Sequence, residues 1–122
     1  MSVVQHVGLE VRRDDADAEV TFWALLGFEE VPAPAALRER TRWVQRDGQQ
    51  IHLLFAGAPV IPGEGHVAVV APEWQATLTR LRAAGHEAAL RTEYWGHPPS
   101  PRTQVHTPAG HRVEVMAVPP PG

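Results

Sequence analysis

An internal repeat of about 60 residues is the feature that most limits how this 122-residue chain can fold. Four pairs of matching positions recur at nearly constant spacing: His6 and His66 (60 residues), Gly27 and Gly85 (58), Gly48 and Gly110 (62), and His52 and Glu114 (62). A half of this size can hardly bury both faces of a sheet by itself. We therefore expect two similar modules that pair with each other.

Each half shows the same order of elements: one strand, one helix and three strands. Alternating apolar residues predict the strands, and glycines mark the helix ends because they enter the left-handed conformation without penalty. The Asp47-Gly48 pair between two such strands is typical of a hairpin turn. In the first half we expect strands over 3–11, 28–31, 41–46 and 49–55 and a helix that Asp14 or Asp15 caps and that runs to about 26. In the second half we expect strands over 66–71, 86–91, 103–106 and 111–118 and a helix from 72 to Gly85.

These elements predict an α+β fold made of two βαβββ modules paired about a pseudo-twofold axis. The whole chain, 1–122, is then one domain. Module one covers about 1–56, a proline- and glycine-containing linker covers about 57–64, and module two covers about 65–118.

Composition excludes several classes of function. The chain has no cysteine, which excludes disulfides, thiolate zinc sites, iron–sulfur clusters and a cysteine nucleophile. A net charge of −3 without a basic block argues against nucleic acid as a partner. No apolar run approaches the roughly 20 residues of a membrane span, and no basic segment precedes an apolar stretch as in a secretory signal. We therefore expect a cytoplasmic protein that binds neither nucleic acid nor membranes.

Four residues interrupt the apolar alternation in the same way. His6, His52, His66 and Glu114 each lie on the strand face opposite to an apolar stripe that would pack on a helix. One histidine on a strand is usually only a surface or hydrogen-bonded side chain, but a shared face and repeat spacing favour a common site. Imidazole nitrogens and a carboxylate oxygen suit Zn, Fe(II), Mn, Co or Ni. The pattern thus predicts a divalent-metal site.

Short motifs in the same order resemble the vicinal oxygen chelate superfamily, which includes glyoxalase I, extradiol dioxygenases and bleomycin-resistance proteins. The motifs are HVGLEV, LLGFEEV, QQIHLLF, GHVAVV and TPAGHRVEVM, and they cover nearly the whole chain. The resemblance implies metal ligands at His6, His66 and Glu114. Position 52 corresponds to a fourth ligand, which is Glu or Gln in glyoxalase-like members and His here.

The resemblance also implies a function and an assembly. Two adjacent oxygens of a small substrate would chelate the metal, and Glu114 would serve as the catalytic proton-transfer residue. The reaction would be that of an isomerase, a lyase or a dioxygenase, and the protein would be a homodimer. The alternative is a bleomycin-resistance-like module that binds a small molecule or antibiotic without reaction.

Five further residues are candidates for substrate contact. Glu10 shares the strand face of His6, and Trp43 could line the cavity or pack in the core. Trp95 lies in a loop that often forms a substrate lid in the superfamily. Arg102 and Gln104 could contact an anionic substrate group. We expect His111, in contrast, to be solvated.

Overall fold

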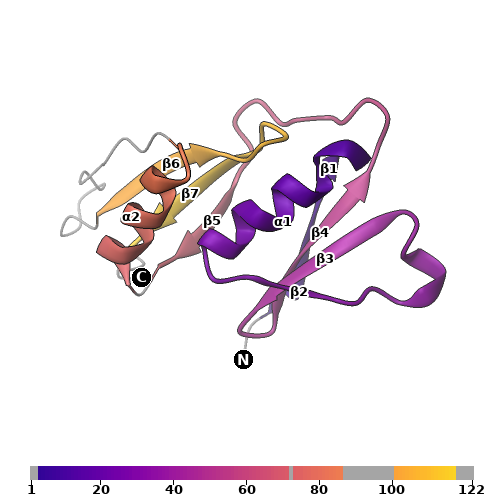
Figure 1. Ribbon diagram of the computed structural model, residues 1–122, viewed down its shortest axis with the longest axis horizontal. Helices are drawn as coiled ribbons and strands as arrows, with labels where there is room; N and C mark the ends of the chain where they lie inside the picture. The colour runs from indigo at the N-terminus through magenta and orange to yellow at the C-terminus, as the bar shows by residue number, and fades with distance from the viewer. Residues whose placement is uncertain (1–2, 72, 87–100, 118–122) are drawn as a thin grey trace. The chain divides into compact units, whose positions relative to one another are not determined.

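The computed structural model describes residues 3–71, 73–86 and 101–117, and the chain divides into two compact units, Met1–Ile61 and Pro62–Gly122 (Figure 1). The described residues form seven strands, two α-helices and two short 3₁₀-helices. The predicted α+β class is confirmed. Neither α-helix in this described part is long and apolar enough to cross a membrane. Pairing of the modules about a pseudo-twofold axis stays a prediction.

The first unit has the predicted βαβββ order. Its elements are β1 (His6–Val11), the 3₁₀-helix η1 (Arg13–Asp15), α1 (Ala16–Leu25), β2 (Glu29–Val31), the 3₁₀-helix η2 (Ala35–Leu37), β3 (Thr41–Arg46) and β4 (Gln49–Phe55). The sheet order is β1-β4-β3-β2, in which β1 and β4 are parallel and the other pairs are antiparallel. The helix α1 contacts β2 and β3 (Figure 1).

Local sequence signals explain where these elements end. Gly27 follows α1 with a φ of 88°, a conformation in which a Cβ would be strained. Asp47 and Gly48 both have positive φ, 50° and 78°, as a two-residue hairpin between β3 and β4 requires. The predicted apolar stripes are buried in part, since Val3 is exposed and Val7 and Phe55 are half-buried. The unit's core includes Leu9, Val11, Phe22, Trp23, Leu26, Val44, Ile51 and Leu53.

The second unit repeats the arrangement of the first. Its described elements are β5 (Val67–Val70), α2 (Trp74–Ala83), β6 (Arg102–His106) and β7 (Arg112–Met116). The sheet order β5-β7-β6 matches β1-β4-β3, with a parallel first pair and an antiparallel second pair. The strand predicted over 86–91 lies outside the described residues except for His86, which follows α2 without entering a strand.

Three local expectations were wrong. The first strand begins at His6 rather than Val3, because its pairing with β4 begins at His6 and Gln50 and leaves Val3 98% exposed. Asp15 stands at the N-cap of α1, but no side-chain hydrogen bond caps the helix. His111 is buried, not solvated, because it closes the turn before β7, where its backbone N–H and C=O both bond Thr107.

An arginine ties three elements of the first unit together. Arg42 on β3 donates hydrogen bonds to both carboxylate oxygens of Glu30 on β2, at 2.8 and 2.9 Å, and also to the carboxylate of Asp17 on α1. The hydrogen bonds from Arg42 are the main cause that lowers the pKa of Glu30. The folded protein therefore holds the Glu30 proton less tightly than the unfolded chain does.

We expect Arg42→Met to lower the free energy of unfolding at neutral pH by less than about 1 kcal/mol, because the Glu30 side chain is 41% exposed and screened by solvent. A lowered carboxyl pKa stabilises the fold above the ordinary value, about 4.3, and that contribution is lost as pH falls through the lowered value. Urea unfolding at pH 7 and pH 3 should therefore show the wild-type advantage only at pH 7. Arg40→Met, at an exposed arginine, is the control. An Arg42→Met defect of equal size at both pH values would contradict the assignment.

Candidate functional site

The strand pairing matches the two units residue by residue around the predicted ligands. In the first sheet His52 pairs with Gly8 on β1 and with Trp43 on β3. In the second sheet Glu114 occupies the same place, between Ala68 on β5 and Gln104 on β6. His6 and His66 precede Gly8 and Ala68 by two residues in each case. The repeat spacing in the sequence therefore corresponds to equivalent positions in the two sheets.

Three aromatic rings form a parallel stack in the first unit. The His52 ring lies 3.9 Å from the Trp43 ring, measured between centroids, with an interplanar angle of 2°. Its other neighbour is the His6 ring, at 4.1 Å and 11°. His52 is only 8% exposed, whereas His6 is exposed. Burial, and secondarily the nearby His6, lower the pKa of His52, so its ring is neutral at pH 7.

Hydrogen bonds fix which ring nitrogen carries the proton. The side-chain oxygen of Gln5 accepts a bond from Nδ1 of His6 at 2.7 Å, so in the neutral ring the lone pair is on Nε2. His52 has the opposite arrangement. Its Nε2 bonds the side-chain oxygen of Gln50 at 2.7 Å, and the Gln50 amide nitrogen in turn donates to Gln45 at 2.7 Å. Because Gln50 uses its oxygen as acceptor, Nε2 of His52 must be the donor.

In the second unit a carboxylate lies between a histidine and an arginine. Glu114 Oε1 is 3.4 Å from Nε2 of His66, and Oε2 is 3.8 Å from Nη1 of Arg102. The carboxylate and the guanidinium are largely buried, with side chains 14% and 12% exposed. Nδ1 of His66 donates to the Glu64 carbonyl at 2.8 Å, so the Nε2 of neutral His66 faces Glu114 with a lone pair.

The structure thus brings the predicted ligands together as one pair in each unit. Within the described part of either unit, no three histidine, aspartate or glutamate side chains form a cluster able to hold a metal. Sequence reasoning missed the hydrogen-bond partners Gln5, Gln50 and the Glu64 carbonyl. The position of Gln50, two residues before His52 on the same strand face, was the available signal.

The other candidate residues have different surroundings. Glu10 Oε1 accepts a hydrogen bond at 2.9 Å from the backbone N–H of Val60, so Glu10 holds the segment after β4. Gln104 pairs with Glu114 in the strand register, and Arg102 lies beside Glu114. Trp43 stacks on His52. Trp95 lies outside the described residues.

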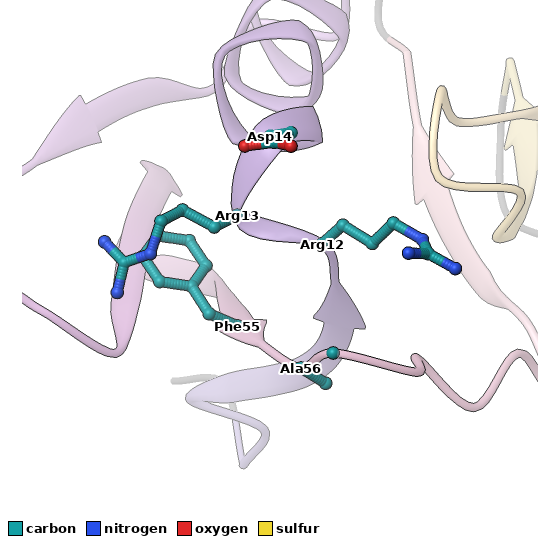
Figure 2. Close-up of a pocket in the computed structure, with 6 residues that line it drawn as sticks. Arg12, Arg13, Asp14, Phe55 and Ala56 are labelled. Atoms are coloured by element: carbon teal, nitrogen blue, oxygen red, sulfur yellow. The ribbon is translucent and has the colours of Figure 1, made fainter.

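A polar pocket of about 360 Å³ opens where the parallel strands β1 and β4 end (Figure 2). Figure 2 shows Arg12 and Arg13 pointing to opposite sides of it. The Arg13 side chain already has two partners. Its guanidinium lies 4.6 Å from the Phe55 ring centre and donates a hydrogen bond to the Glu39 carbonyl. None of the predicted site residues lines this pocket. It is therefore distinct from the histidine and glutamate positions.

Comparison with known proteins points to one family. Residues 8–116 match the family model described as a glyoxalase-like domain. Among solved structures, a candidate glyoxalase family protein from Bacillus anthracis has a TM-score of 0.82 at 21% identity, with 98% of this chain and 97% of that chain covered. Oxidase ChaP-H2 has a TM-score of 0.70 at 21% identity, covering 98% of this chain and 96% of that chain.

Lactoylglutathione lyase from Agrobacterium tumefaciens has a TM-score of 0.69 at 22% identity, covering 96% of this chain and 94% of that chain. No curated protein sequence gave a significant match. At 21–22% identity these three structural likenesses establish the fold alone.

Proposed function

We propose that this chain is a divalent-metal-dependent enzyme. The proposal starts from its family, because the chain belongs to the glyoxalase-like domain family of the vicinal oxygen chelate superfamily. Its substrate would be a small molecule with two adjacent oxygens. The proposed ligands are His6, His66 and Glu114. The reaction class is that of an isomerase, a lyase or a dioxygenase, and the proposed assembly is a homodimer.

The proposal rests on one contact, in which Nε2 of His66 faces the carboxylate of Glu114. In a neutral His66 ring whose Nδ1 donates to the Glu64 carbonyl, the lone pair on Nε2 faces a carboxylate oxygen at 3.4 Å. Such a pair of atoms is stabilised by a cation between them, either a proton or a metal ion. Ligand atoms around a tetrahedral zinc ion with bonds of about 2.1 Å are about 3.4 Å apart, so the donor pair fits a divalent metal.

His6 supports the same interpretation from the first unit. Its Nδ1 donates to Gln5 and its Nε2 keeps a lone pair, as in His66. Histidines that bind metals usually donate their other ring N–H to an oxygen in this way, which fixes the ring orientation. Neither ring has to change tautomer before binding a metal through Nε2.

Residues of the chain itself would accept the proton and contact the substrate. A bound divalent metal would supply Lewis-acid stabilisation of negative charge on the substrate oxygens. Glu114 presents Oε1 toward His66 and Oε2 toward Arg102, and its carboxylate is the group that we propose accepts a substrate proton. Arg102, largely buried beside it, is the residue that we propose contacts an anionic substrate group.

Metal content tests the proposal directly. We expect the protein, purified without a histidine tag, to contain about one Zn, Fe, Mn, Co or Ni ion per chain by elemental analysis. Metal-free protein should recover one equivalent on titration with Zn²⁺ or Co²⁺. A wild-type chain that takes up no metal but binds a cationic antibiotic tightly would instead support the bleomycin-resistance-like alternative.

A further inference from the structure

We infer that His52 is a positioning residue that holds the ring of His6 by stacking and does not itself bind the metal. The inference rests on the proposed function, because it takes His6 as a ligand. It departs from the superfamily pattern, in which the position of His52 belongs to a fourth ligand.

The first argument is the geometry of the stack. His52 lies between two nearly parallel rings, Trp43 at 3.9 Å and His6 at 4.1 Å. Trp43 is its direct partner in the β3–β4 register, so the pairing of two rigid strands sets this contact. Both faces of the His52 ring are therefore covered, and only its edge is left for polar contacts.

The second argument concerns the hydrogen bonds at the edge of the His52 ring. The nitrogen Nε2 of His52 donates to Gln50, and the Gln50 amide is itself oriented by Gln45. A metal needs a deprotonated nitrogen, so binding through Nε2 would break this chain of bonds, and in the neutral His52 ring only Nδ1 keeps a lone pair. His6 and His66 differ, since Nδ1 donates in both and Nε2 carries the lone pair of the neutral ring.

The third argument concerns what His6 needs. His6 is an exposed residue at the first position of β1, where a free side chain would sample several rotamers. The His52 ring, 8% exposed, stacked on Trp43 and bonded to Gln50 at its edge, provides a fixed surface against which His6 can lie. A site works best when neighbouring contacts restrain its ligands. Three protein ligands would also leave the metal more open to substrate than four.

The experiment compares His52→Phe with His52→Ala in metal-free full-length protein titrated with Co²⁺ by calorimetry. Phenylalanine keeps a flat ring and has no nitrogen, so metal affinity should stay within about threefold of wild type. Alanine removes the ring, and affinity should fall about 10–100-fold, the usual effect of losing a residue that orients a ligand. His106→Phe, at an exposed histidine of β6, is the matched control.

Two further measurements complement the titration: the first needs no metal, and the second uses a variant that keeps His52. In metal-free protein, neighbouring rings should shift the His6 ring protons upfield by NMR in wild type and His52→Phe, but not in His52→Ala. Trp43→Leu removes one ring of the stack and leaves every nitrogen of His52 in place. Affinity should fall in this variant if stacking matters and stay unchanged if His52 is a ligand.

The possible failures are distinguishable. If wild type binds Co²⁺ but His52→Phe loses it as completely as His66→Ala, the positioning role is overturned and the metal site survives. Unchanged affinity in both His52→Ala and Trp43→Leu would also overturn it. If wild type binds no Co²⁺, the proposed function fails, and the role of His52 toward a ligand fails with it.

Discussion

Replacing His66 with alanine should lower the affinity for Zn²⁺ or Co²⁺ by more than about 100-fold and abolish turnover together with it. Residues that only orient a metal ligand already cost 10–100-fold in affinity, so loss of a ligand nitrogen should exceed that range. Folding should be little affected, because the His66 side chain is 35% exposed and lies outside the buried core. Calorimetric metal titration and thermal melts of the variant measure the two effects separately.

His106→Ala is the matched control, since His106 is an exposed histidine of the same unit. It should retain full metal affinity and the same melting temperature as wild type. If His66→Ala bound metal as tightly as wild type, the proposed metal site would have to be abandoned.

The Glu114→Gln variant should separate metal binding from proton transfer. Glutamine keeps the size of the side chain and one oxygen that can bind a metal, but it loses the negative charge and the ability to accept a proton. We expect weakened metal binding and a loss of about 10²–10⁴-fold in turnover, the range for removal of a general base. Steady-state rates at saturating metal measure it, on the substrate that a screen of α-ketoaldehydes, catechols and acyl-CoA esters identifies.

Two comparisons make the Glu114 result interpretable. Glu114→Ala also removes the ligand oxygen, so it should lose metal affinity beyond the glutamine variant. Glu73→Gln, at an exposed glutamate before α2, should change neither property. Turnover of Glu114→Gln at the wild-type rate would exclude Glu114 as the base while leaving its role as a ligand open to the titration.

Sequence reasoning succeeded where the cause of a structure is local. The Asp47-Gly48 hairpin follows from backbone conformations that these two residues tolerate well, and Gly27 and Gly85 end the helices for the same reason. The alternation along β4 and β7 follows from the two-residue period of a strand. It placed His52 and Glu114 on the face opposite the buried apolar stripes, and the repeat spacing predicted that they are equivalent positions.

Local sequence signals failed where pairing with a distant segment determines where a strand begins or whether a residue is buried. The alternation of the first strand extends back to Val3, yet the strand begins only where β4 offers a partner, at His6. Similarly, His111 looks like a solvated turn residue, but the hairpin between β6 and β7 buries it to 3% exposure. Exposure at a strand end or turn depends on which segment lies beside it, and the local pattern does not contain that information.

Sequence patterns predicted two units, most of the element order and four residues as metal ligands. The differences between those four residues follow from the fold. The stack on His52 and the choice of its protonated nitrogen depend on Trp43, Gln50 and His6, which three paired strands bring together. Strand order and register set these contacts across gaps of up to 46 residues between His6 and His52, so the repeat could mark His52 as equivalent to Glu114 but could not show its different surroundings.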